Sequence, residues 1–133
     1  MSQENVELAR RLHRAFNERD RAALAEVFDP EVEWVPILAK LEGVSLHGLA
    51  EVNRWIDELD RDWAEFMTDP HEFRDLGDVV LILGTWHARA RHSGLVLDAQ
   101  PGAWVAEVRN GKVVRQETFT DRARALEAVG LSE

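Results

Sequence analysis

Residues 78–119, DVVLILGTWHARARHSGLVLDAQPGAWVAEVRNGKVVRQETF, decide the fold, because they read as three consecutive antiparallel strands with two short turns between them. The first turn is Ser93-Gly94 and the second is Asn110-Gly111. Asn-Gly between apolar runs is the strongest short hairpin signal. We therefore expect strands over residues 78–91, 95–109 and 112–119.

Two-residue turns at both positions would decide which side chains share a face of the sheet. In this register Leu83 lies opposite Trp104, and Trp104 lies opposite Glu117. A bulge at Pro101-Gly102 would shift the far half of the first pairing by one residue. Along the shared face, the side chains change from apolar at one end of the sheet to polar at the other. This pattern predicts a cup-shaped pocket that holds a ligand, with an apolar bottom and a polar mouth. The residues of this mouth are Thr85, His87, Arg89, Asp98 and Gln100.

The opposite face of the same strands is also apolar. It carries Val80, Ile82, Trp86, Ala88, Ala90, Leu97, Ala99, Ala103 and Val105. A sheet that is apolar on both faces needs cover on both sides. Three helices cover only one side, so we expect the outer face to pair with a second copy of the chain in a homodimer.

The rest of the chain predicts helices first and strands later, in a single α+β domain over residues 1–133. Asp20 and Asp121 are the expected N-caps of the second and the last helix. The expected helices are residues 3–18, a short helix that follows Asp20 and stops at Asp29-Pro30, a long third helix that starts near Leu49 and continues past Trp63, and residues 122–129; further strands cover 32–35 and 71–75. Between them, residues 43–48 read as a turn, and Thr68-Asp69-Pro70 reads as the end of the long helix.

Composition narrows the classes of function. The chain has 133 residues, a formal net charge of −9 and no cysteine. An acidic surface repels a phosphate backbone, so nucleic acid is not an expected partner. Disulfides, thiolate nucleophiles and cysteine metal sites are excluded. Neither a signal peptide nor a membrane span is read at the N-terminus, which predicts a cytoplasmic protein without a membrane partner.

Several local phrases resemble the SnoaL-like branch of the nuclear-transport-factor-like cone proteins. They are Phe16-Asn17-Glu18-Arg19-Asp20, residues 28–34 (FDPEVEW), His47-Gly48, residues 111–115 (GKVVR) and residues 125–131 (ALEAVGL). The resemblance implies a curved sheet wrapped around the first and third helices, an interior pocket and frequent homodimers. It leaves the activity open, because the family includes isomerases, cyclases, hydrolases, dehydratases and non-catalytic binders.

The catalytic residues of two groups of relatives are not all present here. The steroid-isomerase relatives place a carboxylate, a tyrosine and a second acid where this chain has Trp34, Leu12 and Trp104. That machinery is therefore disfavoured. The epoxide-hydrolase relatives combine an arginine with two acids. Arg115 and Glu117 have the spacing of the arginine and one acid, but the neighbouring strand supplies no second acid.

Glu117 is the first candidate for a catalytic acid or base, because a carboxylate beside Trp104 and Leu83 would be desolvated. The alternative for Glu117 is a salt bridge with Arg115. His87 and Arg89 are candidates for stabilising negative charge on oxygen. The alternatives are a hydrogen-bonded structural histidine and a plain ion pair of Arg89 with Asp98. The candidate ligand-binding residues are Trp34, Asp98, Gln100, Trp104, Arg115 and Phe119.

Two functions follow from these candidates. The first is a cofactor-independent acid/base enzyme that acts on a small apolar carbonyl or polyketide-like substrate, with Glu117, His87 and Arg89 as its catalytic residues. The second is a non-catalytic domain that binds an apolar metabolite or serves as a dimeric scaffold. The histidines show no ligand spacing, so neither a metal nor a cofactor is expected.

Overall fold

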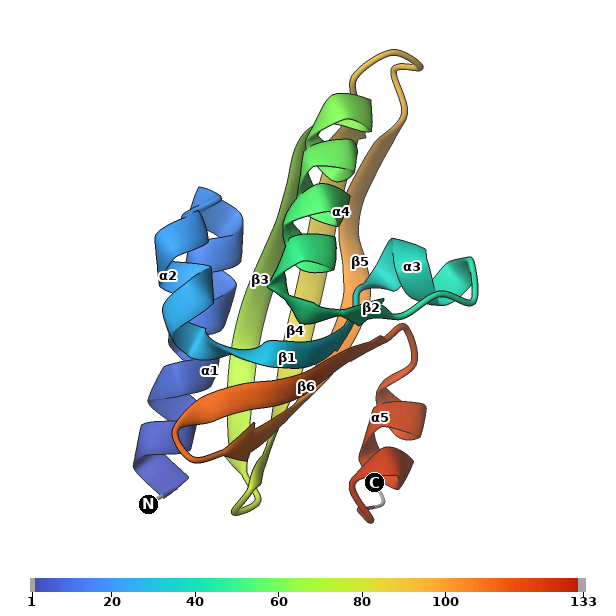
Figure 1. Ribbon diagram of the computed structural model, residues 1–133. Coiled ribbons are helices and arrows are strands. Elements are labelled where there is room, and N and C mark those ends of the chain that lie inside the picture. Colours follow the sequence, from blue (N-terminus) through green and yellow to red (C-terminus); the bar gives the residue numbers. More distant parts are fainter. Residues whose placement is uncertain (1, 132–133) are drawn as a thin grey trace.

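The computed structural model describes residues 2–131 and shows an α+β cone in which helices cover one curved sheet (Figure 1). In chain order the elements are α1 (Ser2–Glu18), α2 (Arg21–Val27), β1 (Phe28–Val35), α3 (Ile37–Leu41), β2 (Leu46–His47), α4 (Gly48–Asp62), β3 (Trp63–Asp75), β4 (Val79–Ala90), β5 (Val96–Arg109), β6 (Lys112–Phe119) and α5 (Arg122–Ala128). Within residues 2–131, no helix is both long and apolar enough to cross a bilayer.

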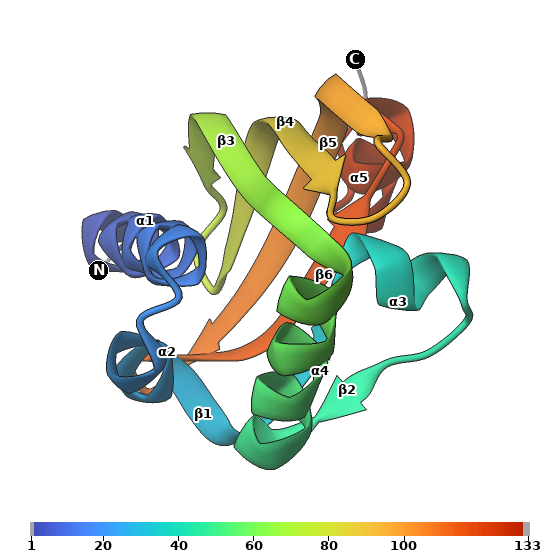
Figure 2. The same cartoon turned by 90° about the horizontal axis from the view of Figure 1, so that it is seen from above.

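The six strands form one open, mixed sheet in the order β2-β1-β6-β5-β4-β3. Strands β1 and β6 run parallel, and the other neighbouring pairs run antiparallel. The long strands β3, β4 and β5 bend, so that the sheet curves around the helices when seen from above (Figure 2). The curvature creates a concave face that is lined by inward-pointing side chains.

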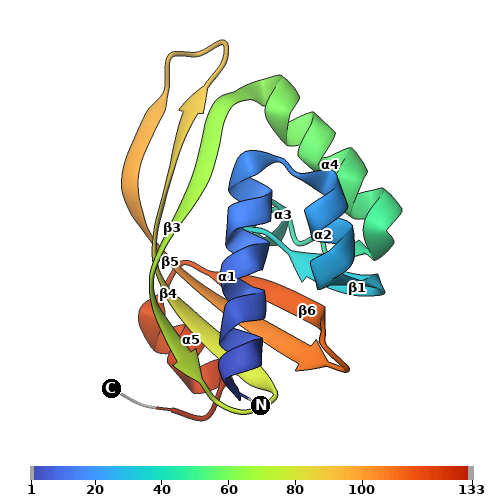
Figure 3. The ribbon, with the colours of Figure 1, turned by 90° about the vertical axis from the view of Figure 1, so that its left-hand side faces the viewer.

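Helices α1, α2 and α4 lie on the concave side, whereas α5 lies on the convex side (Figure 3). The main core joins side chains of α1, α2 and α4 to the concave face of the sheet. A smaller core joins Ala125 and Leu126 of α5 to Leu81, Leu83 and Val105 on the convex face. Helix α5 therefore covers part of the face that the main core leaves open.

Local sequence signals positioned most helix ends correctly. The side chain of Asp20 accepts a hydrogen bond from the backbone N–H of Ala23 at 3.0 Å, and Asp121 does the same for Ala123 at 2.8 Å. These contacts satisfy backbone donors that the first turn of a helix leaves free. Both predicted N-caps are confirmed.

Three short stretches differ from the sequence-based expectation. Helix α4 ends at Asp62, and β3 begins at Trp63 rather than at residue 71. A short helix, α3, precedes the expected turn, and a two-residue strand, β2, lies within it. Thr68 and Pro70 lie inside β3, which is an edge strand, and an edge strand tolerates proline because one side needs no hydrogen-bond donor.

The predicted register of the first hairpin is wrong by two residues next to the loop and by one residue beyond a bulge. The backbone N–H of Ala90 donates to the carbonyl of Leu95 at 2.9 Å, so the loop holds residues 91–94 instead of Ser93 and Gly94 alone. A bulge follows at Ala99, which has a φ of 44°. As a result, Ile82 rather than Leu83 lies opposite Trp104.

The second hairpin begins as predicted and then shifts. Asn110 and Gly111 form a two-residue turn with φ angles of 54° and 75°, and Val108 pairs with Val113. A bulge then moves the pairing by one residue, so that Glu117 lies opposite Val105 instead of Trp104. A one-residue shift turns every following side chain to the other face.

Because of the two register shifts, part of the side chains lie on the opposite face of the sheet from the predicted one. Val80, Ile82, Trp86 and Ala88, which were expected on the outside, pack against the helices in the main core. These four residues were expected to lie in the homodimer interface, but the concave helices already cover them. The dimer itself stays a prediction.

Candidate functional site

A cavity lies between the concave face of the sheet and helices α1, α2 and α4. Its volume is about 40 Å³, which is room for a few water molecules. The lining residues are Leu12, His13, Phe16, Leu24, Phe28, Trp34, Pro36, Ile37, Trp55, Phe66, Thr68, Trp86, Trp104, Gln116 and Thr118. Within this lining, Trp55 alone is not fully buried, so it marks the side of the cavity nearest to solvent.

Seven of the fifteen residues that line the cavity are phenylalanines or tryptophans. Trp34 meets Trp55 edge to face with ring centroids 5.3 Å apart, and it meets Phe16 in the same way at 5.8 Å. Phe66 and Trp86 are stacked at 5.2 Å. In such pairs, contacts with the neighbouring rings fix the orientation of each ring. The wall is therefore apolar, with flat surfaces.

A few polar groups interrupt this apolar wall. His13, Thr68, Gln116 and Thr118 are buried and line the cavity. Two buried atoms of the lining, the indole Nε1 of Trp86 and the amide Oε1 of Gln116, have no hydrogen-bond partner among residues 2–131. A buried polar atom without a partner costs about 1–3 kcal/mol. Such atoms in a cavity are candidates for contacting an occupant.

His13 is the titratable group of this cavity. Burial lowers its pKa from 6.5 to about 4, because a charged imidazolium would lose its hydration there. The ring is therefore neutral at pH 7. Its centroid lies 4.8 Å from that of Trp104 in an edge-to-face arrangement. A neutral imidazole offers one hydrogen-bond donor and one acceptor to its surroundings.

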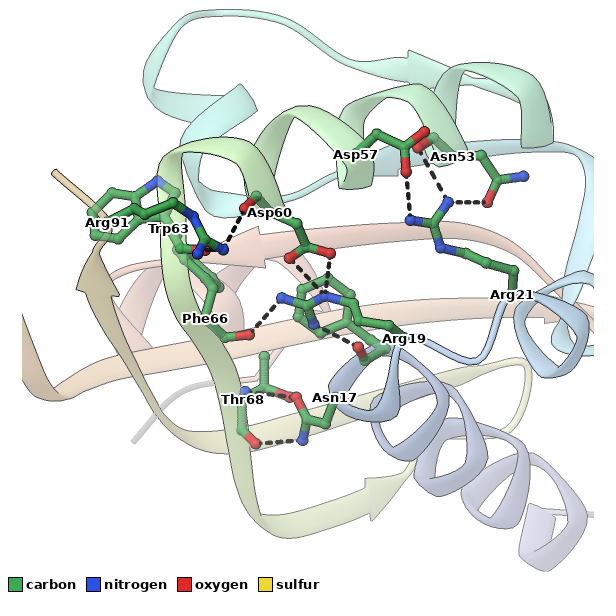
Figure 4. A network of polar contacts seen from close by, with 11 residues as sticks. Asn17, Arg19, Arg21, Asn53, Asp57, Asp60, Trp63, Phe66, Thr68 and Arg91 are labelled. Atoms are coloured by element: carbon green, nitrogen blue, oxygen red, sulfur yellow. Dashed lines mark hydrogen bonds and ion pairs between the residues drawn. The ribbon is translucent and has the colours of Figure 1, made fainter.

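Asn17 of α1, Thr68 of β3 and Gln116 of β6 surround the polar atoms of the histidine ring. Nδ1 of His13 lies 2.9 Å from the hydroxyl of Thr68, and that hydroxyl lies 3.3 Å from Oδ1 of Asn17. Asn17 also binds the backbone of Thr68 twice, at 2.9 Å through its Oδ1 and at 2.8 Å through its Nδ2 (Figure 4). On the other side of the ring, Nε2 of His13 lies 3.5 Å from Nε2 of Gln116.

An arginine clasp fixes the end of α1 against α4 and β3 beside the cavity. The guanidinium of Arg19 binds Asp60 at 3.0 Å and donates to the carbonyls of Phe16 and Phe66 (Figure 4). It also lies 4.4 Å above the ring of Phe16. Because Phe16 and Phe66 are wall residues, the clasp helps to set the width of the cavity at that end.

Glu117, the first catalytic candidate, lies on the convex face and does not line the cavity. Its carboxylate binds Lys40 at 2.9 Å and Arg115 at 2.8 Å. Burial alone would raise the pKa of Glu117, but the hydrogen bonds from Lys40 and Arg115 outweigh burial and lower it. Glu117 is thus an ion-paired carboxylate, and its predicted place beside Trp104 and Leu83 is wrong.

Arg115 and Phe119 belong to the same convex cluster. Burial would lower the pKa of Arg115, but hydrogen bonds to Glu117 and Glu33 raise it, which keeps the guanidinium charged. The ammonium of Lys40 lies 3.7 Å from the centroid of the Phe119 ring. The structure brings these predicted residues together, although outside the interior cavity.

The predicted polar mouth is also placed differently. His87 faces away from the cavity, with Nδ1 2.8 Å from Asp69 and Nε2 3.6 Å from Glu65. Arg89 is exposed and pairs with Val96, so the predicted partnership of Arg89 with Asp98 is wrong. Asp98 is exposed. The partner of Gln100 across the strands is Trp86 rather than His87.

Of the predicted site residues, Trp34 and Trp104 line the cavity. The sequence reasoning missed His13 and Gln116. A signal for His13 was present, because it lies four residues after Ala9 and three before Phe16 on the apolar stripe of α1. Gln116 could have been identified only if the bulge in the second hairpin had been predicted, because that bulge turns Gln116 instead of Glu117 toward the cavity. Within residues 2–131, no group of three or more histidine, aspartate or glutamate side chains is placed to hold a metal ion.

A model of the SnoaL-like domain family matches residues 9–116, which include every cavity-lining residue except Thr118. The chain belongs to the SnoaL-like family. No curated protein matches it. The SnoaL-like assignment predicted from the sequence is confirmed, and so is the curved α+β cone.

Solved structures agree on the fold of this SnoaL-like domain. An NTF2-like protein of unknown function from Burkholderia pseudomallei is 26% identical, with a TM-score of 0.77 over 96% of this chain and 98% of the other. TerC, co-crystallised with polyporic acid, is 23% identical, with a TM-score of 0.76 over 95% and 98%. A protein with a ketosteroid isomerase-like fold from Catenulispora acidiphila, in complex with trimethylamine, is 17% identical, with a TM-score of 0.75 over 94% and 93%.

Proposed function

We propose that this SnoaL-like domain binds a small, uncharged, largely apolar molecule with an oxygen function in its interior cavity. The observation that carries the proposal is the pair of buried polar atoms without partners, Trp86 Nε1 and Gln116 Oε1, in an otherwise apolar wall. One atom donates and the other accepts a hydrogen bond. A hydroxyl compound would satisfy both atoms, a carbonyl compound would satisfy the Trp86 donor, and either would recover part of the cost of their burial.

The lining also selects against charge. None of the cavity-lining residues in the described part of the chain carries a charge at pH 7, since His13 is neutral there. A carboxylate or ammonium in this place would lose its hydration without gaining a counter-charge, which costs several kcal/mol. The occupant is therefore an alcohol, a phenol or a ketone rather than an acid or an amine.

The shape of the cavity favours a flat occupant. Its walls are indole and phenyl rings, and 40 Å³ is less than one aromatic ring needs. A ring-sized molecule therefore has to open the wall, and Trp55 is the lining residue on the solvent side. The fold relatives crystallised with polyporic acid and with trimethylamine support the use of this fold to hold small molecules.

An acid/base enzyme is the second candidate function, and His13 is the observation that favours it. His13 replaces Glu117 as the proposed proton acceptor, because Glu117 is held by two cations outside the cavity. A base whose conjugate acid has a pKa of about 4 accepts protons only from an acidic substrate, such as an enol or a diketone. Faster exchange of the central protons of acetylacetone into deuterium oxide with wild type than with His13→Phe would support this candidate, and equal rates would refute it.

Binding is tested with three compounds of similar shape: phenol, toluene and benzoate. Phenol carries the hydroxyl, toluene lacks it, and benzoate adds a charge. The readout is the set of indole N–H signals in a ¹⁵N NMR spectrum, because each tryptophan contributes one. We expect millimolar phenol to shift the signals of Trp86 and Trp104 more than that of Trp63, which does not line the cavity.

The matched variants are Trp86→Phe, which removes the donor, and Gln116→Leu, which removes the acceptor. Each should weaken phenol binding about fivefold, the effect of one neutral hydrogen bond, without weakening toluene. Gln100→Leu on the same sheet is the control and should leave phenol binding unchanged. Equal shifts of Trp63 and the cavity indoles, or tighter binding of benzoate than phenol, would refute the proposal.

A further inference from the structure

We propose that Asn17 is a positioning residue that, through the hydroxyl of Thr68, holds His13 in the tautomer with its hydrogen on Nδ1. The lone pair of Nε2 then faces Gln116 and the cavity, and it makes the site selective for molecules that donate a hydrogen bond. The selectivity rests on the proposed function of the cavity, whereas the tautomer can be measured without any ligand.

The first step is the orientation of the Asn17 amide. The backbone N–H of Thr68 donates to Oδ1 at 2.9 Å, and Nδ2 donates to the carbonyl of Thr68 at 2.8 Å. A flipped amide would place two donors against each other and two acceptors against each other. Oδ1 is therefore the atom that faces the hydroxyl of Thr68.

Second, the hydroxyl of Thr68 has a single proton, which it can donate either to Oδ1 of Asn17 or to Nδ1 of His13. Its oxygen lies 3.3 Å from Oδ1 of Asn17, which can only accept, and 2.9 Å from Nδ1 of His13. If the hydroxyl donates to Oδ1, Nδ1–H of His13 donates to the hydroxyl and both contacts are satisfied. If it donated to Nδ1, two oxygens would face each other at 3.3 Å with no proton between them. The first arrangement therefore prevails.

The third step concerns the other nitrogen of the ring. With the proton on Nδ1, Nε2 of His13 is an acceptor. Its nearest partner is Nε2 of Gln116 at 3.5 Å, which is long for a hydrogen bond, so the lone pair is poorly satisfied. Oε1 of Gln116 is a second acceptor without a partner among the described residues. Two acceptors at one wall favour an occupant with a hydroxyl group.

Asn17 can act in this way because of its place in the helix. It lies four residues after His13, so both side chains lie on the same face of α1 toward β3. His13 and Thr68 are buried, and Nδ1 of His13 lies 2.9 Å from the hydroxyl of Thr68, so the protein itself supplies the partner of that nitrogen. Asn17 is thus the group that sets the direction of the whole chain of hydrogen bonds.

The tautomer is measured by ¹⁵N NMR of the His13 ring, in which protonated and unprotonated nitrogens have distinct chemical shifts. We expect Nδ1 to be protonated and Nε2 unprotonated in the wild type and in Thr68→Ser, which keeps the hydroxyl. Asn17→Ala and Thr68→Val should both move the ring toward the Nε2–H form. An Nε2–H ring in the wild type, or an unchanged ring in Asn17→Ala, would overturn the proposal; Thr68→Val decides if Asn17→Ala fails to fold.

The selectivity is measured with phenol and anisole, which share the oxygen but differ in the donated proton. The wild type should bind phenol about fivefold more tightly, and Asn17→Ala should lose that preference. Equal affinity for both compounds in the wild type would overturn the selectivity. Absence of binding of either compound, together with an Nδ1–H ring, would refute the proposed function and leave the role of Asn17 intact.

Discussion

The burial of neutral His13 predicts that acid destabilises the protein before its carboxylates titrate. The pKa of His13 is 6.5 when the ring is exposed and about 4 in the folded chain. Between these values the unfolded chain binds more protons than the folded one, so stability rises with pH and is lost as the pH falls. For this difference in pKa, the loss is about 2 kcal/mol between pH 7 and pH 5 and about 3 kcal/mol below pH 4.

Urea denaturation of the wild type, His13→Asn and His71→Asn, each at pH 7 and pH 5, measures this loss. His13→Asn removes the titrating ring and keeps an amide that can donate to Thr68. Its free energy of unfolding should change little between the two pH values. His71 is exposed, so His71→Asn should lose as much stability as the wild type.

This pH window separates His13 from the ion-paired carboxylates. The pKa of Glu117 is lowered from 4.5, so its contribution to stability is complete above that value and is lost only as the pH falls further. Parallel losses in the wild type and His13→Asn between pH 7 and pH 5 would refute a buried neutral ring. If His13→Asn does not fold, an NMR titration in which the His13 ring protonates above pH 6 would refute it equally.

Three further predictions concern the framework around the cavity, each read from urea or thermal unfolding. Glu117→Gln should lower the free energy of unfolding by about 1–2 kcal/mol, because Lys40 and Arg115 lose the anion that they share. Phenol binding in the cavity should stay unchanged. A loss of binding would contradict the placement of Glu117 outside the cavity. Gly84→Ala should cost at least about 2 kcal/mol, because its Cβ would overlap the carbonyl oxygen of Asp69; a neutral effect would mean that β3 does not lie against this glycine. Asp60→Ala should cost about 1–2 kcal/mol and Asp57→Ala less than about 0.5 kcal/mol, because their side chains are 41% and 68% exposed; equal costs would contradict the arginine clasp.

The elements of this fold follow from local signals, which is why most of them could be predicted. The apolar stripe of α1, the caps at Asp20 and Asp121, and the turn at Asn110-Gly111 each depend on residues close in sequence. The short elements α3 and β2 could not be predicted in this way. Their few residues carry too little periodicity, and contacts with the sheet stabilise them.

The site was harder to predict, because it depends on whether the odd-numbered or the even-numbered residues of each strand point toward the concave face. The bulge at Ala99 decides that Trp86, rather than His87, lies on the same face as Trp104, whereas the longer loop shifts the pairing by two residues and leaves the faces unchanged. The second bulge exchanges Glu117 for Gln116 in the same way. The bulge could not be predicted from Ala99, because alanine rarely adopts a positive φ. The sequence therefore predicts a cup but misassigns its polar lining.

The concentration of tryptophan around the cavity makes the protein its own optical reporter. Four of its five tryptophans, Trp34, Trp55, Trp86 and Trp104, form the wall, and the chain contains no tyrosine. Most of its tryptophan fluorescence therefore originates beside the cavity. A compound that enters, or water that leaves, changes the surroundings of most emitting rings at once, so that occupancy can be followed by fluorescence in the unlabelled protein.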